Sequence, residues 1–590
     1  MGIFLNPFKI HSRDREILTD VVAPISSAPR YIPGKRAAQV SSSPSSSSVE
    51  SGTIANAPEC YTFETLRAAI APPAGTTNVE NTPYSRKSRV VNLAIQDIGM
   101  GPYTWRLFAL CGFGWFADNM WLQGLALILT SIQREFGIED SRIGYTTCAL
   151  FVGLCCGAVG WGVLSDFWGR RIAFNATLAI AAVFGLAVGG ANSWITTAAL
   201  FACLGTGVGG NLPVDGALFL EFLPEKNGNL LAGLSVWWPV GQLVGSLVAW
   251  GFVPKHSCTA EVADAGHCRK EDNMGWRYLI ITLGGLTMVM FIARFFTFHL
   301  YESPKFYISR GRDGEAVSVV HGIAHKNKTK TWLTLDLLRE LSRADDDHDH
   351  GNHPSITATT PSPSAMEESS KLSAMQIIKT RTERFTLKQI RPLFADRKLG
   401  LTTALVWFCW ATIGMGYPLF NAFLPIYLTK NGAGGVKPNS IVYRNYAITS
   451  IVGVPGSLVA MYTIDTPYFG RKHTLSISTL LSGIFLFLFT ISTQDTYQLT
   501  FTCLEAFFQN IMYGCLYTFT PELFPAPVRG TGVGLASFIN RVAGLCAPII
   551  ATNTIGRDPN VPVYVAGGLI LAAGVAVLGV PVETRGREKL

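Results

Sequence analysis

The stretch that decides the fold is GVLSDFWGRR, residues 162–171, which follows a long apolar segment. Its last three residues, Gly169-Arg170-Arg171, recur as Gly470-Arg471-Lys472, and a second pattern, Glu221 to Pro224, recurs as Glu522 to Pro525. Both recurrences have the same offset, because 470 − 169 and 522 − 221 each equal 301. Two independent motifs at one offset indicate an internal duplication whose copies keep the same orientation.

The composition places most of the chain in a lipid bilayer. Of its 590 residues, 48% are hydrophobic and only 15% are charged, whereas an ordinary soluble protein is about a quarter charged. The polar residues gather in segments 1–104 and 300–399, and the rest is almost purely apolar. A helix needs roughly 20 consecutive apolar residues to cross a bilayer. We therefore expect twelve membrane-spanning helices, near residues 105–130, 143–164, 172–191, 194–222, 229–252, 275–299, 400–428, 443–464, 474–492, 496–520, 530–552 and 561–581.

The offset and the apolar runs together divide the chain into four parts. Residues 1–104 contain the serine-rich run 41–48 and little apolar periodicity, so we expect a disordered cytoplasmic tail with a short segment before the first helix. Residues 105–299 form the first six-helix half, 300–399 a partly disordered cytoplasmic loop, and 400–590 the second half with a short cytoplasmic tail. The predicted fold is an all-α membrane protein with twelve transmembrane helices in two six-helix pseudo-repeats.

Basic residues beside the apolar runs set the expected orientation. Lys305 and Arg312 follow the sixth run, and a second basic cluster within 381–398 precedes the seventh. Because cytoplasmic loops carry an excess of lysine and arginine, the central loop and both termini are expected to be cytoplasmic. Cys258 and Cys268 share a polar loop on the other side. They could pair if that side is oxidising, and the sequence leaves this open.

The central loop contains an acidic, histidine-rich stretch from Asp345 to His350, with His353 beyond it. Such side chains can chelate a divalent metal, but ligands on an unstructured chain bind weakly and unselectively. We therefore expect a solvated acidic stretch here and no metal site.

The sequence offers no catalytic machinery. It contains no recognisable nucleophile–base pair, phosphate-binding loop or metal quartet, and the GxxxxGK[ST] motif that binds ATP is absent. The net charge of +8 is small for this length, and membrane topology explains it better than nucleic acid does. We expect no enzymatic activity, no cofactor and no nucleic-acid partner. The expected partners are the lipid bilayer, a small-molecule substrate and protons, and the protein is expected to be a monomer.

Several of these motifs resemble those of a known transporter family. GVLSDFWGRR resembles the signature of the loop between helices 2 and 3 in the major facilitator superfamily, and the resemblance extends over residues 105–590. Glu302-Ser303-Pro304 and the segment 583–587 resemble the sugar-porter-like branch. The segments 205–215 and 521–532 are similar to the synaptic vesicle glycoprotein and organic ion transporter group, and the overall look is that of a fungal member.

The resemblance implies alternating access controlled by charged latches at the cytoplasmic ends of the helices. In the family, carboxylate–guanidinium contacts there hold the outward-open state and break for inward opening. The second copy departs from the pattern, because Asp465 precedes Gly470 by five residues where Asp166 precedes Gly169 by three, and we expect that copy to be weaker. The matching residues are Asp166, Arg170, Arg171 and Glu221 in the first half and Arg471, Glu522 and Arg529 in the second.

Among the ionisable residues inside predicted spans, three stand out: Asp118, Asp215 and Arg541. A charge in a spanning helix costs several kcal/mol unless it is paired or hydrated, so each is a functional candidate. A desolvated carboxylate can exchange protons near neutral pH, whereas arginine stays charged and needs a counter-ion. We expect Asp118 and Asp215 to couple transport to protons, with Arg541 beside them. The alternative is a fixed Asp118–Arg541 salt bridge that only locks helices together.

Asp118 matches the helix 1 aspartate of proton-coupled sugar porters. The resemblance also shows a loss, because Phe201 stands where those proteins carry the partner arginine. The glutamines with which sugar porters bind hexoses are likewise missing from the seventh span, so ordinary hexose transport is disfavoured. Polar side chains inside the spans are expected to orient the solute. The expected substrate-binding residues are Arg541, Asn119, Gln123, Asn211, Gln242, Asn421 and Gln509.

The leading hypothesis is a secondary active transporter that moves a small organic ion or polar metabolite by alternating access, coupled to protons. A sugar or inorganic phosphate transporter is the near alternative, and a non-transporting receptor is the distant one. The plasma membrane is favoured over a vacuolar or other internal membrane.

Overall fold

The computed structural model describes residues 17–25, 61–70, 83–224, 227–258, 268–343, 390–394, 396–430, 439–524, 526–554, 558 and 560–584. The regular elements formed by these described residues are all helices. The described residues contain no strand, and their one β-type pairing is an isolated bridge between Val22 and Thr331. The predicted fold class is confirmed.

Each half of the chain contributes six long helices within the described residues, and all twelve lie where the apolar runs predict them. The first half consists of α3 (Pro102–Phe136), α4 (Gly144–Trp168), α5 (Arg170–Val188), α6 (Trp194–Phe222), α8 (Trp237–Phe252) and α10 (Gly275–Ile292). The second consists of α17 (Arg397–Asn421), α19 (Asn439–Thr463), α20 (Gly470–Phe489), α21 (Asp495–Leu523), α22 (Ala526–Thr554) and α23 (Val561–Leu578). Shorter segments adjoin them: α7 (Asn229–Gly233), η6 (Leu234–Val236), η7 (Lys270–Asn273), the π-helical η8 (Ala293–Thr297), η11 (Arg391–Phe394) and α18 (Leu424–Lys430).

Ten of the described helices are long and apolar enough, by length and composition, to cross a bilayer. The two long helices outside that set are α3 and α21, which pack along their neighbours in the same bundle. Each carries a buried carboxylate in its interior, Asp118 in α3 and Glu505 in α21, as α6 does with Asp215. These three helices are therefore the ones in which to look for chemistry.

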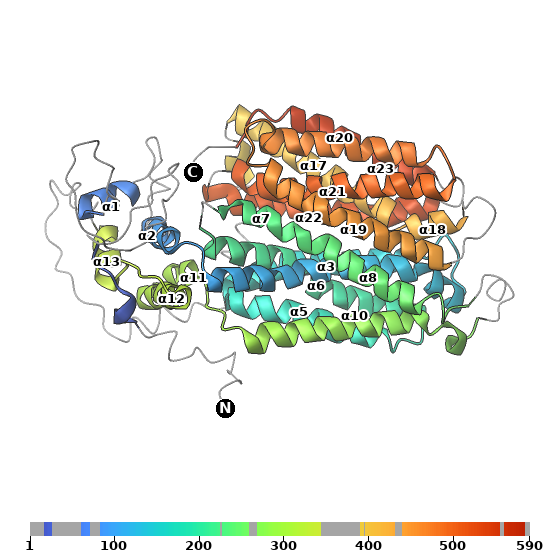
Figure 1. The fold of residues 1–590 in the computed structure, drawn as a ribbon, viewed down its shortest axis with the longest axis horizontal. Coiled ribbons are helices and arrows are strands. Elements are labelled where there is room, and N and C mark those ends of the chain that lie inside the picture. Colours follow the sequence, from blue (N-terminus) through green and yellow to red (C-terminus); the bar gives the residue numbers. More distant parts are fainter. Residues whose placement is uncertain are drawn as a thin grey trace, which may run out of the picture.

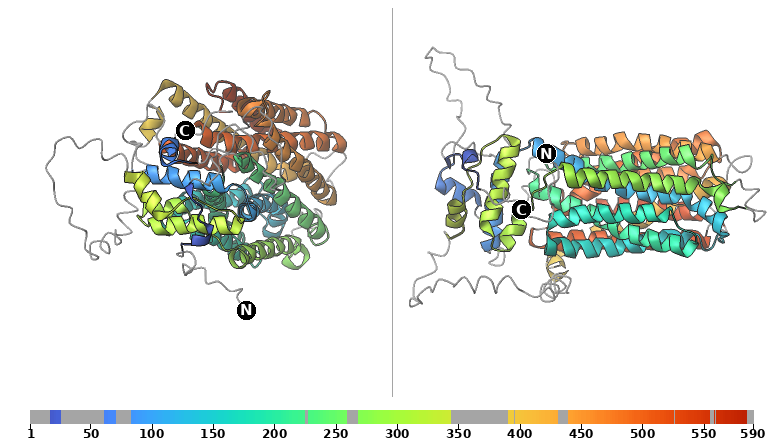
Figure 2. Two further views of the ribbon diagram at one scale, coloured as in Figure 1. Left: turned by 60° about the vertical axis from the view of Figure 1, so that its left-hand side comes forward. Right: turned by 90° about the horizontal axis from the view of Figure 1, so that it is seen from below.

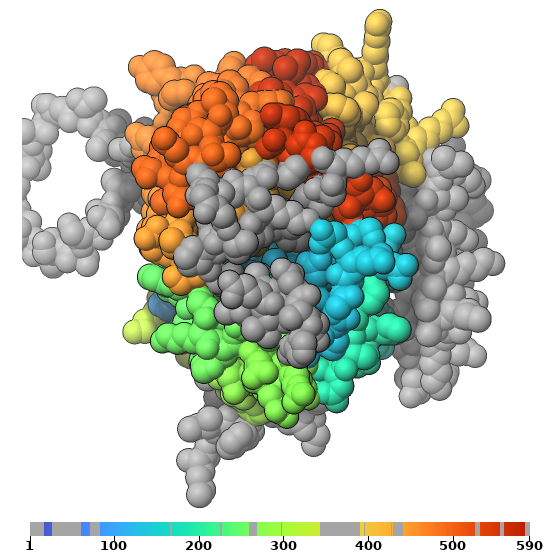
Figure 3. All heavy atoms as spheres, turned by 90° about the vertical axis from the view of Figure 1, so that its right-hand side faces the viewer, coloured from blue at the N-terminus to red at the C-terminus, as the bar shows by residue number. Residues whose placement is uncertain are grey.

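The two halves lie side by side, with their helices running along the long axis of the molecule (Figure 1). The halves meet where α4 packs on α22 and where α8 packs on α19. Seen from one end, the first half, in blue to green, and the second half, in yellow to red, occupy separate sides of the face (Figure 3). This is the arrangement in which two rigid halves can rock about a shared central region.

A group of short helices covers one end of the bundle, which we call the capped end (Figures 1 and 2). The cap consists of η2 (Thr19–Val21), α1 (Phe63–Ile70), α2 (Pro83–Ile98), α11 (Pro304–Ser309), α12 (Asp313–Asn327) and α13 (Leu335–Arg343). It combines the amino-terminal segment with the start of the central loop, and the charge pattern predicts that this end is cytoplasmic.

The cap has its own apolar packing and hydrogen bonds. Trp332 is buried and donates a hydrogen bond from its indole nitrogen to Asp97 at 2.6 Å. Tyr61 packs its ring against that of Trp332, with the ring centroids 6.0 Å apart. Thr331 exchanges backbone hydrogen bonds of 2.9 Å with Val21 and Ala23.

These contacts correct one expectation. Residues 1–104 were expected to be disordered up to a short segment before the first helix, but 17–25, 61–70 and 83–98 fold onto the central loop. Apolar surface supplied by the loop helices offsets the ordering entropy that the tail could not offset alone. The remainder of 1–104 and the acidic stretch 345–350 lie outside the described residues.

Candidate functional site

The first buried charge pair joins α6 to the end of α10. Asp215 Oδ2 lies 2.8 Å from Arg294 Nη2, and neither side chain has exposed surface. Arg294 also donates hydrogen bonds to the backbone oxygens of Phe174 at 2.7 Å and Leu110 at 2.6 Å, and its guanidinium lies over the Phe174 ring. Arg541 was the expected neighbour of Asp215, but the structure pairs Asp215 with Arg294 instead.

Arg294 is the residue that the sequence reasoning missed. It stands in the π-helical turn η8, a geometry that often marks functional positions. The available signal was an arginine inside the sixth apolar run, which required a counter-ion. Gly114 makes the pairing possible, because a Cβ atom at that position of α3 would lie only 1.9 Å from Asp215 Oδ2.

The second charged pair, Asp118 and Arg541, lies between the two halves. Asp118 is 3% exposed, and its Oδ1 accepts a hydrogen bond of 3.0 Å from Asn211 Nδ2. Arg541 reaches from α22 across to α6, where its Nη2 donates to the Gly209 carbonyl at 3.1 Å. No ion pair within 4.0 Å joins Asp118 to Arg541 in the part of the chain that the structure describes. The fixed salt bridge considered above is therefore not formed.

The added arginine changes the charge balance. Three residues, Asp118, Asp215 and Arg541, would leave a net charge of −1 with both acids ionised. With Arg294 included, two carboxylates face two guanidinium groups, so the four side chains are neutral together. One proton on either acid would leave the group with a charge of +1.

Two of the expected polar residues, Asn119 and Gln242, form hydrogen bonds with Tyr417 across the two halves. Gln242 Nε2 donates to Asn119 Oδ1 at 3.1 Å and to Tyr417 Oη at 2.8 Å, and Tyr417 Oη donates to Asn119 Oδ1 at 3.3 Å. Asn119 and Gln242 belong to the first half and Tyr417 to the second. The triangle therefore ties α3 and α8 to α17.

A small cavity lies between α3, α4 and α17. Its volume is about 20 Å³, which is roughly room for one water molecule. Gln123 Nε2 and Thr147 Oγ1 are buried and have no hydrogen-bond partner. In this structure the cavity therefore holds no solute much larger than a water molecule. The lining residues are Leu122, Gln123, Leu125, Ala126, Thr147, Leu150, Phe151, Tyr417, Pro418, Asn421 and Ala422.

A polar chain leads from this cavity into α21. Asn421 lines the cavity and donates from Nδ2 to Gln509 Oε1 at 3.5 Å. Gln509 Nε2 in turn donates to Glu505 Oε1 at 2.6 Å, and Ser482 Oγ donates to the same oxygen at 3.4 Å. The structure thus brings Asn421 and Gln509 together, while Asn211 contacts Asp118.

Aromatic side chains close the site toward the capped end. Trp115 of α3 and Trp238 of α8 stack with centroids 4.7 Å apart. Tyr517 of α21 packs against both rings at 5.5 and 5.0 Å and also contacts Trp410 of α17 at 4.8 Å. We call Trp115, Trp238, Trp410 and Tyr517 the aromatic floor. The aromatic floor joins the two halves on the side of Asp118 that faces the capped end.

The predicted latch residues lie at the capped end of the bundle. Arg170 Nε is 3.7 Å from Glu221 Oε1. Arg471 pairs closely with Glu522 and lies 3.6 Å from Asp465. Of these two pairs, Arg471–Glu522 is the closer. The side chains of Asp166 and Arg529 lie outside the described residues.

Two further carboxylates complete these motifs. Glu302 accepts hydrogen bonds from the backbone nitrogens of Arg170 at 2.7 Å and Arg171 at 3.2 Å, at the start of α5. Glu583 accepts from the backbone nitrogens of Arg471 at 3.1 Å and Lys472 at 3.0 Å, at the start of α20. A carboxylate there satisfies free N–H groups and opposes the positive end of the helix dipole. Burial raises the pKa of Glu302 to about 7.

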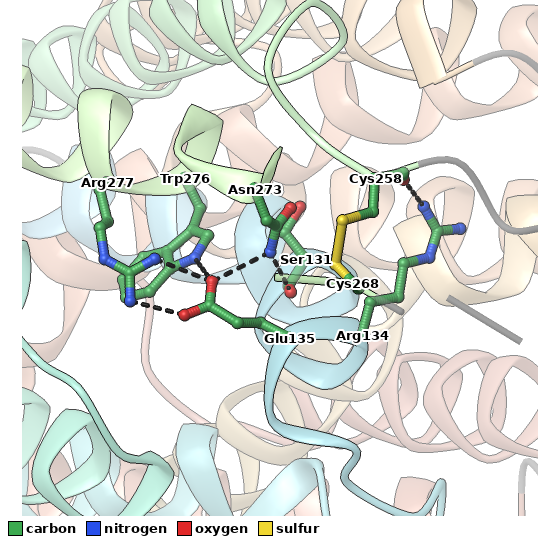
Figure 4. The surroundings of a disulfide bond; sticks show 8 residues. All are labelled: Ser131, Arg134, Glu135, Cys258, Cys268, Asn273, Trp276 and Arg277. Atoms are coloured by element: carbon green, nitrogen blue, oxygen red, sulfur yellow. Dashed lines mark hydrogen bonds and ion pairs between the residues drawn. A yellow bond between two sulfur atoms is a disulfide. The ribbon is translucent and has the colours of Figure 1, made fainter. Parts of the chain in front are cut away.

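The opposite end of the bundle holds a separate polar network (Figure 4). Glu135 pairs with Arg277 at 2.6 Å, and both side chains are nearly fully buried. Glu135 Oε2 also accepts hydrogen bonds from Trp276 at 2.8 Å and Asn273 at 3.2 Å. The neighbouring loop carries a disulfide between Cys258 and Cys268, which resolves the pairing that the sequence left open.

Comparison with known proteins agrees with this architecture. The Major Facilitator Superfamily profile matches residues 105–468 and 445–590. The "MFS siderochrome iron transporter 1" of Ceriporiopsis subvermispora is 42% identical over 508 residues, covering 86% of this chain and 92% of that protein. The "Organic cation/carnitine transporter 7" of Arabidopsis thaliana is 26% identical and covers 84% of this chain and 95% of that protein.

A solved structure supports the fold. The proton:xylose symporter XylE bound to 6-bromo-6-deoxy-D-glucose superposes with a TM-score of 0.59 at 15% identity, over 82% of this chain and 98% of that chain. At this identity the likeness concerns the fold alone. Twelve helices in two repeated halves, matched by the family profile over nearly the whole helical bundle, show that the chain is a membrane transporter, not an enzyme, and belongs to the Major Facilitator Superfamily.

Proposed function

We propose that this transporter carries a small organic anion together with a proton by alternating access. The observation that carries the proposal is the reach of Arg541 from the second half to the Gly209 carbonyl of the first, beside Asp118. A permanent cation from one half therefore meets a protonatable acid of the other half.

The charge balance favours an anion as the cargo. With both carboxylates ionised, Asp118 and Asp215 balance Arg294 and Arg541. A proton on Asp118 leaves one positive charge in excess, which a substrate carboxylate can neutralise. Arg541 has hydrogen-bonding capacity for it, because its Nε is buried without a partner. Proton and anion would thus bind together, since each offsets the charge of the other.

The cavity lining fits the same substrate class. Gln123 Nε2 and Thr147 Oγ1 offer unused donors, and Asn421 and Tyr417 add polar groups on the second half. Most of the other lining residues are apolar. Such a pocket suits a compact solute with an acceptor group and an apolar body.

Asp215 takes a different role in this proposal. Its pair with Arg294 lies entirely inside the first half and has no exposed surface. The guanidinium of Arg294 already neutralises the Asp215 carboxylate, so the pair needs no proton to remain buried. Asp215 and Arg294 would therefore hold α3, α5, α6 and η8 together, and Asp118 would carry the coupled proton.

Alternating access would open the site at one end at a time. Toward the capped end, the aromatic floor and the Arg170–Glu221 and Arg471–Glu522 contacts would separate. At the opposite end, Tyr443 Oη donates to the Leu127 carbonyl at 3.0 Å across the halves, and this contact would break instead. A monomer in the plasma membrane remains our expectation.

An uptake assay tests the proposal. Purified protein in liposomes receives labelled nicotinate, carnitine, a ferric siderophore, xylose or phosphate, with and without an inward proton gradient. We expect nicotinate uptake that the gradient accelerates and that Arg541→Gln abolishes. Arg444→Gln, an exposed arginine of α19, is the matched control and should transport normally. Uptake of xylose alone, or nicotinate uptake that ignores the gradient, would refute the proposal.

A further inference from the structure

Glu505 is a buried carboxylate that the proposed charge circuit does not use. It lies ten residues into α21, which is about 15 Å along the helix at 1.5 Å per residue. The residue is 1% exposed. Its Oε1 accepts from the neutral side chains of Gln509 and Ser482, and its Oε2 is buried without any hydrogen-bond partner.

The surroundings provide no counter-ion. Charged side chains of α20 stand only in its first turn, at Arg471, Lys472 and His473, and α19 carries only the exposed Arg444. On α22, Arg541 is committed to Gly209 of the first half. The other titratable groups that act on this region are the neutral phenols of Tyr417 and Tyr513. Among the described residues, no cationic nitrogen lies within 4.0 Å of Glu505.

An ionised carboxylate with one bare oxygen and no cation is strongly disfavoured in an apolar interior. The neutral acid avoids most of that cost. We propose that Glu505 is protonated in this conformation and serves as a second proton-binding group, located in the second half. In the open states an O–H bond forms at Glu505 with a proton from water on one side, and the same bond breaks to release the proton to water on the other side.

The polar chain gives this group a connection to the substrate. Gln509 bridges Glu505 to Asn421, which lines the cavity. When a solute forms a hydrogen bond with the Asn421 amide, Asn421 no longer donates to Gln509. Gln509 can then reorient, which changes the hydrogen bonding of Glu505. Substrate binding and protonation of Glu505 are thus linked within the second half.

This arrangement differs from the duplicated latches. The position 301 residues before Glu505 is Leu204, so the first half has no counterpart. Asp118 in turn corresponds to Leu419 in the second half. Each half would therefore carry its own proton site, at unrelated positions.

Infrared difference spectroscopy on the full-length protein in lipid tests the protonation state without any substrate. At neutral pH we expect a carboxylic acid C=O band that Glu505→Gln removes. Asp495→Asn, at an exposed position in the first turn of the same helix, should leave the band unchanged. If Glu505→Gln folds poorly, Glu505→Asp should shift the band instead of abolishing it. A band that persists unshifted in both Glu505 variants would overturn the proposal.

The role in transport rests on the proposed function and is tested with nicotinate as the probe. The number of protons moved per nicotinate should fall by one in Glu505→Gln. The two proposals fail separately. Wild-type uptake that ignores pH refutes proton coupling as a whole, whereas a coupled wild type with an unchanged ratio in Glu505→Gln refutes only the role of Glu505.

Discussion

Arg294 Nη2 lies 2.8 Å from Asp215 Oδ2, and both side chains are completely buried. Removing one partner leaves an uncompensated buried charge, which costs about 3–5 kcal/mol. We predict that Arg294→Gln or Asp215→Asn lowers the thermal unfolding midpoint of the purified protein strongly. The double variant should recover part of the loss, because neither charge is then left alone.

The exposed pair Arg142–Glu139 is the matched control for this comparison of single and double variants. Its side chains are 65% and 69% exposed and its atoms are 3.5 Å apart. Such surface pairs contribute little, so the same substitutions there should leave the unfolding midpoint almost unchanged. Equal losses at both sites would mean that burial does not set the strength of the inner pair.

The sequence was sufficient to predict the twelve helices, because crossing a bilayer requires long apolar runs and these are visible directly. It was not sufficient to predict partners. Asp215 and Arg294 are 79 residues apart, and only helix packing brings them together. The folded cap was missed for a related reason. The helix α2 packs on α1, α12 and α13 in one apolar cluster, and the composition of residues 1–104 alone does not reveal the surface that the other segment supplies.

Asp118→Asn should separate proton coupling from substrate movement. The amide keeps the size of the side chain and can still hydrogen-bond to Asn211, but it cannot exchange a proton. We predict that uptake driven by a proton gradient is lost while exchange of labelled for unlabelled nicotinate is retained. Normal gradient-driven uptake in this variant would show that Asp118 does not carry the coupled proton.

The glycines of the duplicated motif should differ in their tolerance of alanine. Gly169 has φ +104° and ψ 157°, a region that only glycine adopts readily, at a cost of about 1–3 kcal/mol for other residues. A Cβ there would also lie 2.3 Å from Glu302 Oε2. Gly470 has φ +63°, and a Cβ atom added there would lie 3.2 Å from the nearest atoms of the Glu583 side chain.

We therefore predict that Gly169→Ala reduces the yield of folded protein and its unfolding midpoint more than Gly470→Ala does. Gly160, whose added Cβ would meet no atom within 4 Å, is the control and should accept alanine. If Gly470→Ala were the more damaging change, the close approach of Glu302 would not be the deciding contact.

The disulfide reports the orientation of the whole molecule. Cys258 and Cys268 form a disulfide between the segment that follows α8 and the segment that precedes η7, and Arg134 Nη1 donates to the Cys258 carbonyl at 3.0 Å. If the end of the bundle with this disulfide faces outward, a membrane-impermeant reductant should expose both thiols to labelling on intact cells. Labelling that requires permeabilised cells would reverse the predicted orientation.

The cap should loosen in acid because of a buried histidine. His321 has no exposed surface, and its Nε2 lies 2.7 Å from the Leu333 carbonyl. Its other ring nitrogen has no partner in the described structure. Burial lowers the pKa of His321 below its ordinary value, and the Leu333 carbonyl and Asp20 offset this only in part.

The sign of the pH effect follows from that shift. The unfolded chain binds the proton first, near an ordinary histidine pKa of about 6.5, so the unfolded form gains stability as the pH falls. The cap is then most stable above about pH 6.5 and weakens below it. We predict that protection from hydrogen exchange, relative to the intrinsic rate at each pH, falls at the amides of Ala23 and Thr331, which donate to the Thr331 and Val21 carbonyls, as the pH is lowered from about 7.5 to about 5.5 across that pKa. His321→Gln keeps a donor for Leu333 without a titrating group and should abolish this dependence, whereas the exposed His473→Gln should preserve it. A loss of protection that is equally large in His321→Gln would assign the acid sensitivity to another group.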